Sequence, residues 1–577
     1  MNWIQQNRRT VSCYAATTLC GVAGILYFYR GFFFGDPVML QGNVGDGALT
    51  LFISGHWSAV SQAMNPLRDL GFFYPAPDTL GYSDTMFLFG ALEWPMTVLG
   101  IPATVRFQAA LVVLSAIGFA GSVALFRVGP RVSWPLAIGG GLVFAFGSGP
   151  YIGSDHPQLL ALNLLPLIGL LAIGARRLRS WRSGLAAVGC GLLTGLVAYS
   201  AFYIGWFILL SLGLVGIVVV LFARAARRSL LSLKEALWRL AGFCAGLGLG
   251  LVPFVYTYGP VLAQGRERPI DEMAAFALTP SDLFNVSSSN LLWGRLVSQP
   301  GLLSASHAGS GEFQMTPTPV LIVVAVVLGI WAARRLRALT GWGHVGLASV
   351  IVGLLLWVAP LKVGPVFPWA VSLYRLPGGE AVRAIGRIEL AAGTLVIFGS
   401  IILLNLWLKQ RRGSLRPAWI ACVGVVAGVV LIEQLQGITV QTLPLALVED
   451  LAEVPQPPAQ CQSFVVTDKR RADDPPYVPQ TEAALVSQRI GVPTWNGYSG
   501  FTPSGWELFD VGTPAYRRQV RAWGTSNGLL GHGCGLNLAT GKWLGPAALW
   551  RTTAQEGMNS SGLRSGSQAN RGVDIPW

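Results

Sequence analysis

Asp46 is the residue of this sequence whose type and neighbours most favour chemistry. It lies in Gly-Asn-Val-Gly-Asp-Gly at residues 42–47. A carboxylate between two glycines sits on backbone that a ligand can approach closely. At a membrane surface such a group can act as a base or hold a hydroxyl group of a substrate. Asp46 is therefore the candidate catalytic residue, and the alternative is an ordinary Asp-Gly turn.

A second polar motif is Gly-Ser-Asp-His-Pro-Gln at residues 153–158. In it, the Asp155 carboxylate could orient the imidazole of His156, or both could bind a metal ion. Two consecutive ligands rarely reach one ion well, and the sequence offers no third ligand. We therefore expect Asp155, His156 and Gln158 to line a substrate site, although a lone histidine is more often structural.

Two arginines stand out before a late apolar stretch, in Val-Arg-Ala-Ile-Gly-Arg at residues 382–387. On a helix, Arg383 and Arg387 would share one face, where both guanidinium groups could bind one phosphate. Their place ahead of an apolar segment favours an anionic partner. The alternatives are salt bridges to Glu380 or Glu389, or contacts with lipid headgroups.

Two further carboxylates belong to the same group of candidates. Glu312 precedes an apolar stretch in Gly-Glu-Phe-Gln at residues 311–314, and Asp84 lies in a long polar and aromatic segment at residues 30–104. Such a segment is longer than a connector between packed helices needs to be. Asp84 could equally cap a helix, because it directly precedes the apolar residues 85–90.

The elements that must position these residues are membrane-spanning helices. The 577 residues are 52% hydrophobic and 12% charged, whereas soluble domains carry about 25% charged residues. A bilayer core needs roughly 20 apolar residues per helix. We therefore predict an all-α bundle with about eleven transmembrane helices, at residues 11–29, 105–126, 134–151, 157–175, 184–200, 203–223, 240–262, 317–333, 345–361, 388–408 and 417–437.

Basic residues give this bundle a direction. The net charge of +14 arises largely from short clusters beside the apolar stretches, a pattern typical of cytoplasmic loops and not of nucleic-acid binding. With these clusters inside, the N-terminus is cytoplasmic, and residues 30–104, 263–316, 362–387 and the C-terminal region are extracytoplasmic. Residues 85–101 are predicted to form an interfacial or re-entrant helix. The clusters comprise Arg8 and Arg9; Arg127 and Arg131; Arg176, Arg177, Arg179 and Arg182; Arg224, Arg227, Arg228, Lys234 and Arg239; Arg334, Arg335 and Arg337; and Lys409, Arg411, Arg412 and Arg416.

Cysteine placement agrees with this topology. Of the seven cysteines, only Cys461 and Cys534 lie outside the predicted spans. In an oxidising compartment such a pair is read as a disulfide. The alternative, two free thiols in a cytosolic tail, would require an even number of spans.

Residues 441–577 are expected to form a small soluble domain, extracytoplasmic and α/β or β-rich. A Pro-rich linker at residues 455–458 precedes a strand-like run at residues 463–467. The loop at residues 493–503 is rich in glycine, proline and aromatic residues, and could stack on a sugar or simply close a turn. The tail from about residue 553 has the composition of a disordered segment.

Taken together, residues 1–440 resemble the GT-C superfamily of membrane glycosyltransferases. The resemblance rests on the order Gly-Asp-Gly, Asp-His-Pro-Gln, Gly-Glu and Val-Arg-Ala-Ile-Gly-Arg, with an Asp in a long first external loop. These motifs are similar to those of bacterial GT-C-like proteins that use polyprenyl-phosphate sugars. The resemblance implies a cell-envelope enzyme of the bacterial cytoplasmic membrane.

The implied reaction is an inverting transfer of a sugar from a polyprenyl-phosphate donor to a lipid, glycan or protein acceptor on the extracytoplasmic face. By this resemblance Asp46 would activate or orient the acceptor hydroxyl, and Arg383 and Arg387 would hold the donor phosphate. Asp155 and His156 would line the sugar or acceptor site. Many members have a second acidic residue, a role for which Asp36, Asp84 and Asp155 compete, so dependence on a divalent metal stays open.

Two other classes of function remain as alternatives. A transporter or flippase of lipid-linked glycans would use the same charged residues as substrate contacts, but transporters often contain inverted repeats, and no repeat is evident. A non-catalytic assembly factor would use the C-terminal domain as its binding module. Density for a bound lipid phosphate in a structure would distinguish catalysis from transport by its position relative to Asp46 and Arg387.

Overall fold

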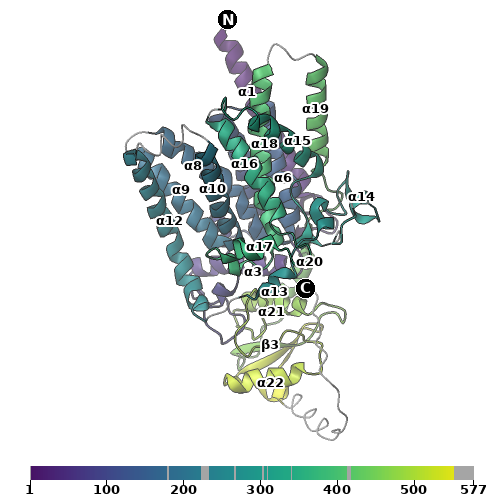
Figure 1. The fold of residues 1–577 in the computed structure, drawn as a ribbon. Coiled ribbons are helices and arrows are strands. Elements are labelled where there is room, and N and C mark those ends of the chain that lie inside the picture. Colours follow the sequence, from purple (N-terminus) through teal and green to yellow (C-terminus); the bar gives the residue numbers. More distant parts are fainter. Residues whose placement is uncertain are drawn as a thin grey trace. The chain divides into compact units, whose positions relative to one another are not determined.

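The computed structural model describes residues 2–178, 181–222, 233–264, 268–301, 304–307, 310–339, 341–411 and 417–550. The chain divides into two compact units (Figure 1). Unit 1 comprises Met1–Leu70 and Leu80–Leu447, and unit 2 comprises Gly71–Thr79 and Val448–Trp577. The expected disordered tail and part of the basic clusters, at residues 179, 224–228 and 412–416, lie outside the described residues.

Unit 1 is helical, as predicted. Its α-helices are α1 (Asn2–Phe28), α2 (Arg30–Phe33), α3 (Asp46–Ser61), α4 (Phe87–Val98), α5 (Ala103–Val128), α6 (Trp134–Phe146), α7 (Ser148–Ile152), α8 (Leu165–Arg177), α9 (Trp181–Ser200), α10 (Phe202–Phe222), α12 (Leu233–Leu262), α13 (Ile270–Ala274), α14 (Gly294–Ser298), α15 (Pro319–Ala333), α16 (Trp342–Val358), α17 (Pro368–Val371), α18 (Glu389–Arg411) and α19 (Pro417–Ile432). Helix α20 (Leu445–Ala452) crosses the boundary to unit 2.

Short 3₁₀ helices connect the longer elements. They are η1 (Thr79–Tyr82), η2 (Gly153–Asp155), η3 (Pro157–Leu164), η4 (Pro280–Phe284), η5 (Gly311–Phe313), η6 (Leu373–Arg375), η7 (Gly379–Ala381) and η8 (Ile385–Ile388). A 3₁₀ run is rarely longer than about four residues, so the eight-residue η3 is unusual. It continues directly into α8.

By length and composition, seven helical segments of the described residues could cross a membrane. They are Thr10–Phe28, Ala103–Val128, Pro157–Arg177, Trp181–Ser200, Phe202–Phe222, Leu237–Leu262 and Ile385–Arg411; Pro319–Ala333, Trp342–Val358 and Ala421–Ile432 are apolar but shorter. These helices fit an integral membrane protein. The predicted span at residues 134–151 is broken at Gly147 into α6 and α7, so the count of eleven stays a prediction.

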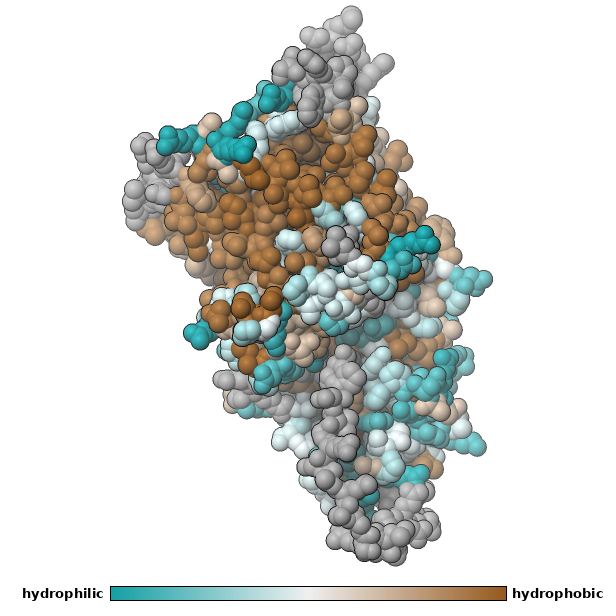
Figure 2. Space-filling model, turned by 45° about the vertical axis from the view of Figure 1, so that its right-hand side comes forward, coloured by the Kyte–Doolittle hydropathy of each residue, from teal (hydrophilic) through white to brown (hydrophobic). Residues whose placement is uncertain are grey.

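The surface of unit 1 is apolar over a broad area. Figure 2 shows a continuous brown region of hydrophobic residues over the helices. Residues that contribute apolar exposed side chains include Val252 and Val255 of α12, Val323 of α15 and Val425 of α19, each more than 60% exposed. A patch of this extent on a water-soluble monomer would be exceptional, whereas a helix bundle in lipid requires it.

Glycines allow the backbones of α9 and α12 to lie close together. In α9, Gly191 and Gly195 lie against the backbone of α12, and Gly246 of α12 lies against Val188 of α9. A Cβ atom added to Gly191 would lie 2.0 Å from the Phe243 carbonyl oxygen, and one added to Gly246 would lie 2.0 Å from that of Val188. Small residues let helix backbones approach in this way.

A two-stranded antiparallel sheet joins the two ends of unit 1 in sequence. Strand β1 (Met39–Gln41) pairs with β2 (Gln441–Pro444), with Leu40 opposite Leu443. Gln441 Nε2 donates to Gln41 Oε1 at 2.7 Å, and both side chains are buried. Residues 441–447, which the sequence analysis assigned to the C-terminal domain, therefore belong to unit 1.

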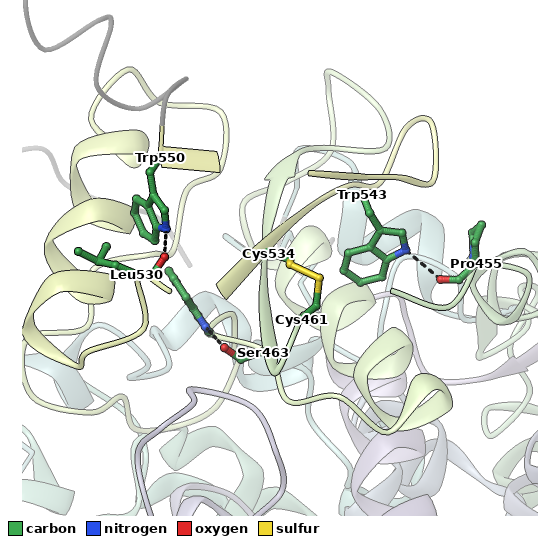
Figure 3. The surroundings of a disulfide bond; sticks show 8 residues. Pro455, Cys461, Ser463, Leu530, Cys534, Trp543 and Trp550 are labelled. Atoms are coloured by element: carbon green, nitrogen blue, oxygen red, sulfur yellow. Dashed lines mark hydrogen bonds between the residues drawn. A yellow bond between two sulfur atoms is a disulfide. The ribbon is translucent and has the colours of Figure 1, made fainter. Parts of the chain in front are cut away.

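Among its described residues, unit 2 contains a three-stranded sheet and two helices besides the end of α20. Strands β3 (Ser463–Asp468) and β4 (Gly533–Asn537) are parallel, and β5 (Lys542–Leu544) pairs antiparallel with β4. Helices α21 (Tyr477–Ile490) and α22 (Tyr516–Ser526) complete the unit. A disulfide links Cys461 to Cys534 of β4, the two cysteines that the sequence analysis paired (Figure 3).

The loop at residues 493–503 is part of the core of unit 2. Trp495 is fully buried, and its Nε1 donates to Ser463 Oγ at 2.8 Å. Asn496 is also fully buried and donates to Gln480 Oε1 and to the hydroxyl of Tyr516. Trp495 is therefore not available to stack on a sugar, because its indole has no exposed face.

Unit 2 also includes a segment from the first third of the chain. Residues Gly71–Thr79 were expected to lie in the first external loop. Within this segment, Phe73 N donates to the Asn496 carbonyl at 2.9 Å, and Tyr74 N donates to that of Thr494 at 2.9 Å. Phe72 and Phe73 are fully buried against this loop.

Candidate functional site

The residues singled out in the sequence lie at one end of the helix bundle of unit 1. Helix α3 begins at Asp46 and α18 begins at Glu389, just after Arg387. Figure 1 shows α3, α13 and α17 at the end of the bundle opposite the start of α1. Helix N-termini carry partial positive charge and favour anions, so this end suits an anionic ligand.

Asp46 is held at the first position of α3. The side chain of Asn43 fixes the helix start, since its Oδ1 accepts from the backbone N–H groups of Gly45 at 2.9 Å and Asp46 at 2.8 Å. Gly47 packs against the backbone of Gly42, where a Cβ atom would lie 2.7 Å from the Gly42 carbonyl carbon. The glycines therefore serve close backbone packing, and the Asp46 side chain, 26% exposed, stays open to a ligand.

His156 joins Asp46 to a second carboxylate. It lies between η2 and η3, where Pro157 starts the 3₁₀ run. His156 Nδ1 is 3.4 Å from Asp46 Oδ2, and His156 Nε2 is 2.9 Å from Glu312 Oε1. The imidazole thus bridges two carboxylates, each of which lies more than 100 residues from His156 in the sequence.

Glu312 and Arg387 form a bidentate pair. Arg387 Nε donates to Glu312 Oε2 at 3.0 Å, and Arg387 Nη2 donates to Glu312 Oε1. Gly386 makes this approach possible, because a Cβ atom there would lie 2.6 Å from the Glu312 carbonyl oxygen. The ring of Tyr203 lies 5.5 Å from the Arg387 guanidinium carbon.

The charges of Asp46, His156, Glu312 and Arg387 influence one another. Burial and Arg387 both oppose protonation of the imidazole, yet the Asp46 and Glu312 carboxylates raise the pKa of His156 to about 9. Burial opposes ionisation of Glu312 as well, but Arg387 and His156 hold the pKa of its carboxyl well below its usual value. Burial opposes ionisation of Asp46 too, but His156 and Arg387 lower the pKa of its carboxyl. At neutral pH the cluster therefore holds two anions and two cations.

Arg387 and His156 lie close together because both contact the same carboxylate oxygen, Glu312 Oε1. Arg387 Nη2 lies 2.8 Å from His156 Nε2. A protonated Nε2 cannot accept from the guanidinium, so both groups donate to Glu312 Oε1, which lies between them. Glu312 thereby holds two cationic groups close together.

Asp155 lies beside this cluster. Its Oδ2 is 3.4 Å from the position of a Cβ atom on Gly311, next to Glu312. Burial raises the pKa of the Asp155 carboxyl, and Asp46 and Glu312 add to that rise against the effect of His156. Of these two carboxyls, Asp155 is thus the stronger base.

Asp84 and Gln158 lie on another side of the same cluster. Asp84 Oδ1 accepts from the backbone N–H of Phe202, the first residue of α10, at 2.8 Å. The Asp84 carboxyl group also interacts with the Gln158 side chain. The sequence suggested that Asp84 caps the helix that follows it. Its side chain instead accepts from the first residue of α10, and not from the start of α4. Burial raises the pKa of the Asp84 carboxyl against the effect of Phe202, Arg387 and His156.

Arg383 does not share a helix face with Arg387. Residues 382–384 are irregular between η7 and η8, so the expected i, i+4 geometry does not form. The guanidinium carbon of Arg383 lies 5.3 Å from the centre of the Phe276 ring, and its Nη1 is 3.9 Å from Glu272 Oε1. The structure therefore brings Asp46, Asp84, Asp155, His156, Gln158, Glu312 and Arg387 together and leaves Arg383 apart.

Tyr203 is a neighbour of this site that the sequence analysis did not single out. Its hydroxyl accepts from the backbone N–H of Arg383 at 2.8 Å, and its ring faces Arg387. It therefore links the two arginines. Its position at the start of a predicted span, where aromatic residues are common, gave no separate signal.

A small pocket opens beside the cluster. It is lined by Gly153, His156, Leu159, Gly311, Glu312, Gln314, Gly386, Arg387, Glu389 and Leu390. No three His, Cys, Asp or Glu side chains of the described residues are arranged as ligands of a metal ion.

Comparisons with known proteins complete the description. No protein-family model matches the chain, and no curated protein sequence matches it. Among solved structures, the chain is similar to the crystal structure of the Archaeoglobus fulgidus oligosaccharyltransferase in the apo form, with 12% sequence identity and a TM-score of 0.46. The similarity covers 84% of this chain, which spans 64% of the length of the archaeal protein.

Proposed function

We propose that this protein is a membrane glycosyltransferase that transfers a sugar from a polyprenyl-phosphate donor to a hydroxyl group of a lipid, glycan or protein acceptor on the extracytoplasmic face. The observation that supports it is the cluster of Asp46, His156, Glu312 and Arg387 beside a pocket. Such a cluster offers cations for a phosphate and carboxylates for an acceptor in one place. The reaction needs both.

The cations are proposed to bind the leaving group. Arg387 Nη1 has no hydrogen-bond partner among the described residues, so the guanidinium can keep Glu312 on one edge and accept a phosphate on another. The protonated His156 adds a second positive charge close by. Charge that develops on the phosphate as the bond to the sugar breaks would be stabilised there.

The carboxylates are proposed to orient the acceptor hydroxyl group and to receive its proton. As the anomeric carbon loses the phosphate oxygen, the acceptor oxygen bonds to it from the opposite face, and the acceptor proton passes to a carboxylate. The low pKa of Asp46 favours hydrogen bonding and orientation of the acceptor over early proton removal. Asp155, whose pKa is raised, is the better group to receive the proton.

The remaining predicted roles follow from position. Asp84 and Gln158 would hold the start of α10 and a polar group of the substrate at the edge of the site. Arg383 would contact an outer part of the phosphate or a lipid headgroup, since 32% of its side chain is exposed.

The test compares binding with transfer. In purified full-length protein, Asp46→Asn should still bind a polyprenyl-phosphate sugar but lose transfer by about 100-fold or more. Arg387→Ala should weaken donor binding first, because phosphate contact is its proposed task. Matched controls are Asp271→Asn and Arg295→Ala, which change exposed residues of α13 and α14.

Three results would argue against this function. Undiminished transfer by Asp46→Asn would remove that residue from the reaction. Movement of intact glycolipid between leaflets without transfer would indicate a flippase. Labelling of introduced cysteines near residue 480 only from the cytoplasmic side would reverse the assumed orientation.

A further inference from the structure

Glu389 is a buried carboxylate without a partner that lines the pocket of the proposed site. Its side chain is 1% exposed, and neither oxygen accepts a hydrogen bond from any described residue. It shares the pocket lining with His156, Glu312 and Arg387. A buried polar group left unpaired costs free energy, so this placement calls for an explanation.

Helix capping does not supply the explanation. Glu389 is the first residue of α18, where a carboxylate is favoured by the helix dipole and can accept from free backbone N–H groups. Its oxygens make no such bond. Arg387, two residues earlier, donates to Glu312 from Nε and Nη2 and makes no hydrogen bond to Glu389.

The same chain shows how a structural buried carboxylate is satisfied. Glu433 is fully buried and accepts from Thr318 Oγ1, from the backbone N–H groups of Val320 at 3.0 Å and Leu321 at 2.9 Å, and from Trp293 Nε1 at 3.0 Å. Glu389 has none of these contacts. No described residue supplies a donor to Glu389, so a ligand in the pocket is the candidate source.

We propose that Glu389 contacts the sugar moiety of the donor, by hydrogen bonds with its hydroxyl or N-acyl groups. This inference rests on the proposed function and extends it to the recognition of the sugar. Glu389 and Arg387 line the same small pocket, so a sugar attached to a phosphate at the guanidinium would reach the carboxyl group if the pocket widens when the donor binds. A polyprenyl phosphate without a sugar would not need Glu389.

The test measures binding to full-length protein in detergent with EDTA. The probes are undecaprenyl phosphate and the same lipid carrying a hexose, an N-acetylhexosamine or a pentose. Glu389→Leu should weaken binding of the preferred glycosylated lipid by about 10-fold to 100-fold, because the sugar groups lose a buried partner. Binding of undecaprenyl phosphate should not change. Glu389→Gln should fall between the wild type and Glu389→Leu.

A second measurement separates this role from a structural one. Glu389→Leu should keep or raise the thermal stability of the ligand-free protein, since it removes an unpaired buried polar group. Glu433→Gln should lower it, because that carboxylate is fully bonded. Ser400→Ala, at a buried position of the same helix outside the pocket, is the control for binding.

The possible failures are distinguishable. If the wild type prefers a glycosylated lipid and Glu389→Leu keeps that preference, the role of Glu389 is wrong and the proposed function stands. Equal losses for both kinds of lipid, a loss of stability, or wild-type binding that requires a divalent cation would also overturn the role. If the wild type binds no glycosylated lipid better than undecaprenyl phosphate, the proposed function and this inference both fail.

Discussion

At the scale of single residues, the site is a balanced set of charges held in contact. Glu312 satisfies both cations, and Asp46 adds a second carboxylate to His156. A phosphate entering the site would share Arg387 with Glu312 and would meet a protonated imidazole. The charge of His156 therefore decides how well the site accepts an anion.

The titration of His156 gives a pH-dependent prediction. Its pKa is about 9 in the folded protein and about 6.5 in an unfolded chain. The stability that its proton contributes is complete below about pH 6.5 and is lost as pH rises through about 9. We expect wild-type thermal stability and lipid-phosphate affinity to fall over this range, and the fall to be absent in His156→Gln.

The size of this effect is bounded by the pKa shift. A shift of this size corresponds to roughly 3 kcal/mol at most. His532→Gln, which changes an exposed histidine of unit 2, should show the wild-type pH profile. A His156→Gln profile that matches the wild type would contradict the predicted proton uptake.

At the scale of elements, glycines and irregular helices set the geometry. Gly386 lets η8 approach η5, and the 3₁₀ run η3 begins directly after His156. The helix that the sequence suggested around Arg383 does not form, because residues 382–384 interrupt it. Site geometry thus depends on short segments with weak intrinsic preferences, placed by the long helices around them.

The contact between α9 and α12 allows a matched test of helix packing. Gly246→Ala would place a methyl group 2.0 Å from the Val188 carbonyl, so the helices must separate. We expect a loss of about 1–3 kcal/mol or more, seen as a lower melting temperature and lower yield in detergent. Gly248→Ala, two residues on with no atom within 4 Å of the added Cβ, should be neutral or slightly stabilising.

Equal effects of the two substitutions would contradict this packing. Helix propensity favours alanine over glycine at both positions by the same amount, about 1 kcal/mol. Only the steric contact differs between them. The comparison therefore isolates the backbone approach of α9 and α12.

At the scale of the whole molecule, each unit contains contacts between segments that are far apart in the sequence. Strand β2 pairs with β1 about 400 residues before it, within unit 1. Gly71–Thr79 supplies buried aromatic rings to unit 2, most of which follows Leu447. Each unit is therefore completed only by parts that are distant in sequence.

Phe73 tests the membership of this early segment in unit 2. Its ring is fully buried and lies 4.8 Å from that of Trp506, centre to centre. Phe73→Ala should destabilise unit 2 by about 3–5 kcal/mol, measured as faster proteolysis of residues 448–550 in the intact protein. Phe34→Ala, at a position 70% exposed, is the control; unchanged protection in Phe73→Ala would mean that the segment is not part of the core.

The disulfide offers a second test of unit 2. It joins residues 73 apart in sequence, and closing a loop of that length restricts the unfolded chain by roughly 4 kcal/mol. Cys461→Ser with Cys534→Ser should lower the stability of unit 2 and abolish its sensitivity to reducing agents. Cys244→Ser, at an exposed position of α12, should leave both unchanged.

The sequence by itself determined the helical class, most of the long apolar helices and the pair of cysteines that the structure links. It could do so because a bilayer demands about 20 apolar residues per crossing, a signal carried by each segment alone. For the same reason Asp46, His156, Glu312 and Arg387 were each visible as polar residues beside apolar stretches. Gly71–Thr79 carried no comparable signal, since its buried aromatics resemble those of any loop.

Only the tertiary structure decided that those four residues meet, and that Arg383 does not join them. Their contacts depend on where α3, η3, η5 and η8 end in space, and residues 46, 156, 312 and 387 share no local pattern that would fix those distances. It also decided that Glu389 lines the pocket without a hydrogen-bond partner among the residues that the structure describes. Whether a carboxylate finds a donor depends on the packing of neighbouring segments, which local sequence does not specify.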